Sequence, residues 1–283
     1  MPTPDEPGKG LATFNPSESA FPVLFSQDGE GSIAQVIEDN FGDEGFSPSD
    51  LDRLTIPSGG GTSWEVPDED PVRAIEGVIV HRQQTRSMWF KKRGEDGEDD
   101  GPPDCYSPDG KHGIGVMGPG SESNPSGECI TCPFNVFGTS TSGSGNGKAC
   151  KEQMQVFMLR EDAVLPIQLS LPPTSLKPFR KHMTRLATKG KSYYAVVTRF
   201  ALKVEKGGGQ TYSVIEPSTV LQLAPEEVAA ARAYGHTMKT YLEQAAAARA
   251  AADASEHNAA ATAGGSADPD GVDASTGAPA GKG

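Results

Sequence analysis

The sequence lacks any run of about 18 apolar residues, the length that a transmembrane helix needs. The segment from Met1 to Pro7 also lacks the basic and apolar regions of a secretory signal peptide. Both absences argue against a membrane or secreted protein. We therefore expect a soluble chain in a reducing cytoplasm.

Common catalytic motifs are absent too. The sequence contains no HExxH, GxSxG or GxxxxGKS pattern, and its acidic residues concentrate in Gly94–Asp104 and toward the two ends, where they would be solvated. No pair of carboxylates stands beside a histidine at a plausible strand end. We therefore predict no catalytic residues and a protein that is not an enzyme.

Hydrophobic residues are scarce, at 35% of the chain, whereas glycine and proline number 34 and 23. Many of these glycines and prolines lie before Pro71 or after Gly264, where little apolar sequence is present to build a core. We expect a largely disordered acidic segment over residues 1–48, a folded core over 49–224, a C-terminal helix over 225–250 and a flexible tail over 251–283.

Five stretches of the core region have the β-branched and aromatic composition of strands. They cover residues 72–91, 155–159, 164–171, 193–204 and 211–216. Gly77 is expected to mark a β-bulge in the first of them. A helix over residues 176–188 separates the third from the fourth, because apolar residues recur there at helical spacing. These residues are Leu176, Phe179, Met183 and Leu186.

Five strands with one helix between the third and the fourth match the order of an oligonucleotide/oligosaccharide-binding (OB) barrel. We therefore predict a mostly β, α+β fold: an OB-like five-stranded barrel with an insert at residues 102–152. An α+β sheet with a different strand pairing has the same order of elements and stays an alternative.

Only four cysteines are present, and all of them fall within this insert. Cys129 and Cys132 form a CxxC pair, while Cys105 and Cys150 stand singly on either side. In a reducing compartment such thiols are more often metal ligands than disulfides, and four thiolates suit a tetrahedral structural Zn²⁺ ion. We predict that these four cysteines hold zinc and that its binding supplies the folding energy that the insert lacks.

Other interpretations of the cysteines stay open at this level. The four thiols are unrelated and merely reduced, or His112 replaces one of them as a ligand, or the CxxC pair is redox-active. Nothing around the pair resembles the βαβ unit of thioredoxin, which argues against the redox alternative.

The net charge of −13 conceals two basic regions. Nine basic residues and one acid lie between Leu171 and Lys206, and six basic residues and one acid lie between Pro71 and Arg93. Cations that follow phosphates and aromatic rings that stack on bases are what a single-strand groove needs. We predict nucleic-acid contacts from Arg82, Arg86, Trp89, Lys91, Tyr193, Arg199, Lys203 and Tyr212.

Some of the neighbouring residues have a simpler explanation. Aromatic residues dominate buried sheet faces, so we expect Phe90, Tyr194 and Phe200 to lie in the core. The basic face of the helix over 176–188 is typical of a solvated surface. Acidic segments outside the basic regions are expected to compete for the basic groove or to recruit replication or recombination proteins.

Several stretches share a pattern: Asp50–Leu51 with Ile56–Gly61, Trp64–Glu65, Gly77–Ile79, Cys105–Gly110, Cys129–Pro133 and Gly147–Lys151. Together they resemble a family of poorly characterised proteins encoded by tailed phages and mobile elements of Gram-positive bacteria. The resemblance covers roughly residues 50–225, and the cysteine pattern is its most specific part. It implies a zinc-containing single-stranded-DNA-binding protein of a replication or recombination module, in the cytoplasm of a bacterial host cell.

These observations predict a sequence-nonspecific single-stranded DNA-binding protein with structural zinc. The alternatives are a non-catalytic virion or interaction protein that uses zinc for folding, and a nucleic-acid-processing enzyme. Salt-dependent binding to single strands, presence in purified particles and cleavage of DNA with Mg²⁺ would distinguish the three.

Overall fold

The computed structural model describes residues 19–25, 32–42, 46, 50–90, 103–140, 146–161, 163–207 and 209–263. The chain divides into two compact units, Met1–Ala245 and Ala246–Gly283. The sheet, the cysteine insert and the first turns of the C-terminal helix all belong to the first unit. In the second unit, the described residues continue that helix.

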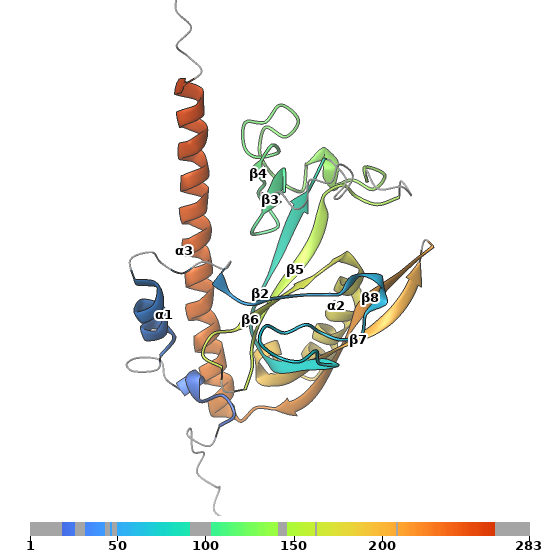
Figure 1. Ribbon diagram of the computed structural model, residues 1–283, viewed down its shortest axis with the longest axis vertical. Coiled ribbons are helices and arrows are strands. Elements are labelled where there is room, and N and C mark those ends of the chain that lie inside the picture. The colour runs from blue at the N-terminus through green and yellow to red at the C-terminus, as the bar shows by residue number, and fades with distance from the viewer. Residues whose placement is uncertain are drawn as a thin grey trace, which may run out of the picture. The chain divides into compact units, whose positions relative to one another are not determined.

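An eight-stranded sheet forms the centre of the first unit (Figure 1). Its longer strands are β2 (Ala74–Met88), β5 (Lys151–Leu159), β6 (Ile167–Leu171), β7 (Val196–Gly207) and β8 (Gln210–Gln222). The short strands are β1 (Arg53–Thr55), β3 (Cys105–Ser107) and β4 (Ile114–Gly115). The prediction of a mixed α and β fold is confirmed.

Strand β2 organises the sheet because both of its edges are paired. One edge pairs antiparallel with β5, from Val78 to Ser87. The other edge pairs first with β7, over Ala74–Val78, and then with β3, over Arg86–Met88. The β7–β8 hairpin therefore diverges from the insert, which continues from the far ends of β2 and β5 (Figure 1).

The sheet differs from the predicted five-stranded barrel at its edges. Strand β6 pairs with β5 on one side and in parallel with β1 on the other, while β8 pairs only with β7 among the described strands. Because β1 occupies the edge of β6 that a closed barrel would use, the described strands form an open, curled sheet.

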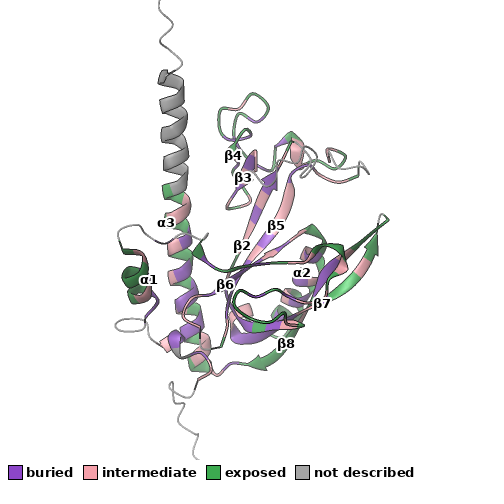
Figure 2. Cartoon of the chain, in the orientation of Figure 1, coloured by how far each residue is buried: buried purple, intermediate pink, exposed green. Residues whose placement is uncertain are grey.

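Each face of the sheet carries its own hydrophobic core, as the alternation along β5 illustrates. Val156 and Met158 point to one face, where the helix α2 (Pro173–Thr188) covers them. Phe157 and Leu159 point to the other face, which packs against the helices α1 (Ile33–Phe41) and α3 (Pro225–Ala263). Figure 2 shows the buried side of α3 turned toward the sheet.

Helix α2 begins at Pro173, three residues before the predicted start, because a proline at the first helical position loses no hydrogen bond. Phe179 and Leu186 are buried as predicted. The other two buried residues of the helix are Ser175 and His182, in place of the predicted Leu176 and Met183. The ring of Phe179 stacks on that of Phe200 with centroids 6.3 Å apart. Gly190 follows the helix with a φ of 69° and ends it as predicted.

Helix α3 starts at Pro225 as expected but continues to Ala263, beyond the predicted end at 250. The reason is its alanine-rich sequence, because alanine has the highest helix propensity and no glycine lies between Gly235 and Gly264. Gly235 lets the helix approach β2 closely, because a Cβ added there would lie 2.1 Å from the carbonyl oxygen of Val80.

Part of the segment expected to be largely disordered, residues 1–48, is described and contributes to the core. The short helix η2 (Pro22–Phe25) contains Leu24, which is fully buried, and α1 buries Ile33 and Ile37. Ser32 caps α1 by accepting a hydrogen bond from the backbone N–H of Gln35. The remaining residues of this segment lie outside the described part.

Gly77 does not mark the bulge of β2. The register shift lies between Ile79 and His81, and Gly77 instead allows a close approach, since a Cβ there would be 2.4 Å from the carbonyl oxygen of Leu159.

Among the described helices, none combines the length and the apolar character that a bilayer span requires.

Candidate metal centre and basic surface

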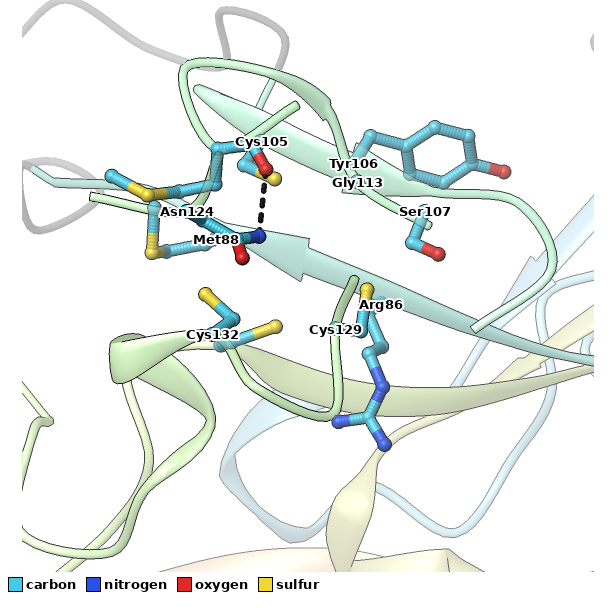
Figure 3. Close-up of a pocket in the computed structure, with 11 residues that line it drawn as sticks. Arg86, Met88, Cys105, Tyr106, Ser107, Gly113, Asn124, Cys129 and Cys132 are labelled. Atoms are coloured by element: carbon cyan, nitrogen blue, oxygen red, sulfur yellow. Dashed lines mark hydrogen bonds between the residues drawn. The ribbon is translucent and has the colours of Figure 1, made fainter. Parts of the chain in front are cut away.

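The four cysteines come from three segments of the insert and line one cavity (Figure 3). Cys105 begins β3, Cys129 and Cys132 precede the short helix η6 (Pro133–Asn135), and Cys150 lies directly before β5. All four side chains are buried, and none forms a disulfide. The structure thus brings together all four predicted ligand residues.

Strand pairing and loop hydrogen bonds position these segments. Cys105 pairs in register with Met88 at the end of β2, and Lys151, next to Cys150, pairs with Ser87. The backbone N–H of Cys129 donates to the carbonyl of Lys111 at 2.6 Å, and that of Cys150 donates to the carbonyl of Phe134 at 3.0 Å. Sheet edges and loop backbone, rather than a large core, therefore hold the cysteines in place.

The cavity between the thiols is small, about 10 Å³, which is room for roughly one water-sized sphere. Met88 and Met117 form its apolar wall. Gly113 lies against it, since a Cβ added there would be 3.1 Å from the Sγ of Cys105. A single ion matches this space better than an organic ligand.

Burial raises the pKa values of Cys105 and Cys129, and raises that of Cys150 to about 11. Nearby donors and a cation oppose this effect. Backbone N–H groups of Met117 and Ile114 lower the pKa of Cys105, and the Arg86 guanidinium lowers those of Cys129 and Cys150. Donors aimed at sulfur are typical of the surroundings of metal-bound thiolates.

The donor set fits zinc, although the side chains do not form a closed site as they stand. In the described part of the chain, no group of three or more His, Cys, Asp or Glu side chains is arranged as a ready metal site. Four thiols that line one small cavity nevertheless match the donor chemistry of a structural Zn²⁺ site.

His112, the alternative ligand, does not line the cavity. Its side chain is 61% exposed, and its Nδ1 lies 2.9 Å from the Oδ2 of Asp109. Asp109 organises this loop, because its Oδ1 also accepts hydrogen bonds from Ser107 Oγ and from the backbone N–H groups of Lys111 and His112. Burial alone would raise the pKa of Asp109, but these hydrogen bonds lower it to about 2.

Arg86, predicted to contact nucleic acid, instead reaches into the insert. Its side chain is only 11% exposed. Its Nε donates to the carbonyl of Gly110 and its Nη1 to the Oδ1 of Asn135, both at 3.0 Å, while Nη2 lies 3.5 Å from Glu152. We therefore assign Arg86 to the framework of the cysteine site rather than to an open groove.

Arg82 and Tyr193 do come together, from residues far apart in the sequence. Arg82 is exposed on β2, and its guanidinium carbon lies 5.5 Å from the ring centroid of Tyr193 in the short helix η7 (Tyr193–Ala195). Burial raises the pKa of Tyr193, although Arg82 acts against that rise. The pair presents a cation and a half-buried ring side by side, as a cation–π contact.

The remaining predicted residues are spread over other elements. On β7, Arg199 and Lys203 face the same side, as their alternation predicts, but each is paired with a carboxylate, Glu76 at 3.0 Å and Glu205 at 2.7 Å. Tyr212 on β8 lies beside Gly207. Trp89 is half-buried, and Lys91 lies outside the described residues.

The aromatic residues assigned to the core have different outcomes. Phe200 is fully buried as predicted, and Tyr194 packs partly buried against the core beneath α3. Phe90 is 43% exposed and contacts the edge of Phe134 at 5.5 Å between centroids, so the prediction for Phe90 is wrong. Phe90 lies two residues beyond the end of β2, outside the paired part of the strand.

Sequence reasoning missed the contribution of α3 to this region. Arg232, His236 and Lys239 line an open groove together with Tyr193 and Tyr194. The available signal was their spacing of four and three residues, which places them on one helical face. That spacing does not show which other elements this face of the helix lies against.

Comparisons with protein-family models, with characterised proteins and with solved structures found no match to this chain. The resemblance to phage-encoded and mobile-element proteins therefore stays a prediction.

Proposed function

We propose that this protein binds single-stranded DNA without sequence specificity, and that a zinc ion held by Cys105, Cys129, Cys132 and Cys150 stabilises its insert. In this proposal the protein is not an enzyme and acts in a replication or recombination module. The observation that carries the proposal is the order of strand pairing around β2.

The pairing order β6–β5–β2–β7–β8, with α2 between β6 and β7, supports this proposal because it resembles the order of an OB barrel, in which the first strand lies between the second and the fourth. The insert then corresponds to the loop between the first and second strands, and the connection between β7 and β8 to the loop between the fourth and fifth. OB folds bind oligonucleotides with these two loops and the adjacent sheet face.

The Arg82–Tyr193 pair supplies chemistry that suits a single strand. A guanidinium attracts phosphates, and an aromatic ring stacks on any base, which gives affinity without sequence specificity. Stacking contributes about 1–3 kcal/mol per base in proteins of this kind. The overall charge of −13 is no obstacle, because the acidic residues are concentrated elsewhere in the chain.

Zinc would add a metal crosslink to the hydrogen bonds that already connect the three segments of the insert. The four cysteines would bind it as thiolates, and the small apolar cavity would exclude water. Ser107 lowers the pKa of Cys129, and Arg86 would offset the negative charge of a four-thiolate site. Such a site has no open position for substrate, so its role is structural.

Fluorescence anisotropy with labelled oligonucleotides tests the proposal. At low salt, wild-type protein should bind a single-stranded oligonucleotide more tightly than the duplex of the same sequence, with affinity that falls as salt rises. Arg82→Ala and Tyr193→Ala should weaken binding, whereas Arg53→Ala, an exposed cation on β1, should not. Equal binding to duplex, or no binding at all, would reject the proposal.

One observation favours the alternative of an interaction protein. Three apolar side chains of the insert are strongly exposed: Ile130 at 83%, Phe137 at 75% and Val136 at 57%. Exposed apolar residues that lie close together in sequence are typical of protein–protein contacts. Absence of DNA binding together with a stable complex in host lysates would support this alternative.

A further inference from the structure

An open groove of about 570 Å³ runs between β2, η7 and the first turns of α3. Its polar and aromatic lining comes from His81, Tyr193, Tyr194, Arg232, His236 and Lys239. All of these residues belong to the first compact unit. None of the described residues that line the groove carries a negative charge.

The helical wall of the groove combines small residues with cations. Ala229 and Ala233 leave space, while Arg232, His236 and Lys239 are exposed on the same face. Gly235 holds this part of α3 against the backbone of Val80. The helix is thus fixed close to the sheet, and Arg232 and Lys239 are exposed where it lines the groove.

The opposite wall is aromatic. The rings of Tyr193 and Tyr194 pack edge to face with centroids 5.2 Å apart, and Arg82 lies over Tyr193 just beside the groove. Burial lowers the pKa of His81, as do the nearby Lys239 and Arg82, so the imidazole of His81 is neutral at pH 7. A neutral ring and two tyrosines offer stacking surface and hydrogen bonds on this side.

Lys239 is the only groove cation with a carboxylate partner among the ion pairs of the described residues. Its Nζ lies 3.5 Å from Glu243, and both side chains are more than half exposed. An exposed pair of this kind is worth little, so the lysine can exchange its partner for a phosphate at little cost. The groove therefore presents net positive charge.

We propose that this groove is a track for single-stranded DNA, in which Arg232 and Lys239 contact phosphates and Tyr193 stacks on a base. The inference rests on the proposed function and deepens it, because it adds phosphate contacts on α3 to the Arg82–Tyr193 pair. Arg232 and Lys239 are about 10 Å apart along the helix axis, at ~1.5 Å per residue. That distance spans roughly three phosphates of a stacked strand, at ~3.4 Å per charge.

The test is the salt dependence of binding to a fluorescein-labelled oligothymidylate, measured by anisotropy for an Arg232→Ala/Lys239→Ala double variant. Each phosphate contact to a single strand contributes about 0.7 to the slope of log Kobs against log salt concentration. The double variant should lower the slope by about 1.4. An Arg53→Ala/Lys189→Ala variant removes the same charge from exposed positions elsewhere and should keep the wild-type slope.

Tyr193→Ala provides a second measurement with a different signature. It should weaken binding about tenfold at every salt concentration without changing the slope, since a stacked base contributes about 1–3 kcal/mol and no counterion release. Tyr193→Phe should retain wild-type affinity. Equal melting temperatures of all variants would exclude loss of folding as the cause.

The outcomes separate the groove from the function. If wild-type protein binds the oligonucleotide but the double variant keeps the same slope and affinity, the groove is not the contact surface and the proposed function still stands. If both double variants lower the slope equally, the effect is one of net charge and the groove inference is wrong. If wild-type protein binds no oligonucleotide, both proposals fail.

Discussion

Arg86 and Asn135 join the central strand to the cysteine site through a single hydrogen bond of 3.0 Å, from Nη1 of the arginine to Oδ1 of the asparagine. The same Oδ1 accepts from Lys148 Nζ at 3.0 Å, and Asn135 Nδ2 donates to the carbonyl of Cys129 at 2.8 Å. Asn135 therefore links β2, the CxxC pair and the segment before Cys150. This arrangement explains how a loop-rich insert keeps a defined position.

Arg86→Met should loosen the insert, because it removes the donor to the carbonyl of Gly110, one of the two donors to Asn135 Oδ1 and the cationic partner of Glu152. Loss of hydrogen bonds to a largely buried charge costs about 1.5–3 kcal/mol each. Hydrogen exchange should accelerate in the described parts of residues 103–150 but not in α2. Arg82→Met, four residues away and exposed, is the matched control and should leave exchange in the insert unchanged. Equal protection in wild type and Arg86→Met would contradict this assignment.

Reduced, freshly purified protein is expected to contain about one zinc per chain, since four thiolates form one tetrahedral site. Chelation, or Cys132→Ser, should destabilise the insert, because zinc binding provides about 10 kcal/mol or more in small zinc modules. Elemental analysis and thermal melting check both points. Thr131→Ser, at the exposed position beside Cys132, should behave as wild type. Purified protein without metal, or a melting curve that chelators leave unchanged, would contradict the proposed metal site.

Gly235→Ala should lower the free energy of unfolding, although alanine is normally the better helix former by about 1 kcal/mol. The added Cβ would lie 2.1 Å from the carbonyl oxygen of Val80, so the helix has to move off the sheet. We expect a net destabilisation of about 1–3 kcal/mol in urea unfolding, as for other overpacked sites. Thr240→Ala, exposed on the same helix, is the control. A more stable Gly235→Ala protein would show that α3 does not pack here.

Asp109 should stabilise the loop that precedes the CxxC pair in a pH-dependent way. Its pKa is lowered to about 2 in the folded chain, against about 3.9 for an unperturbed aspartate. The stabilisation is therefore complete above about pH 4 and is lost as the pH falls toward 2. The melting temperatures of wild type and Asp109→Asn should differ at pH 6 and become equal near pH 2. The exposed control Glu122→Gln should melt at the same temperature as wild type at both pH values. A difference that persists at pH 2 would argue against this role.

Much of the fold follows from local patterns. Three signals each act within a few residues, so they predict elements without knowledge of their neighbours. They are the alternation from Arg199 to Glu205, the apolar spacing in α2 and Pro225 at the start of α3. The clustering of four cysteines in one insert is equally local, and the structure places all of them around one cavity.

The features that were predicted wrongly from the sequence depend on contacts between residues far apart in the chain. The edge of β6 is occupied by β1, more than a hundred residues earlier in the chain, so the sheet stays open where a barrel was predicted. Phe90 is 43% exposed even though its ring contacts that of Phe134 in the insert. Periodicity describes which face a residue occupies but carries no information about what covers that face.

Arg82 and Arg86 illustrate the division between sequence and structure. Both follow from the sequence as cations on one face of the same strand, four residues apart, and nothing in their local pattern distinguishes them. Only the tertiary structure shows that Arg82 lies over the ring of Tyr193 and that Arg86 is largely buried and donates to Asn135. The physical reason is that burial and electrostatics are set by the partners of a side chain, and these partners lie far away along the chain.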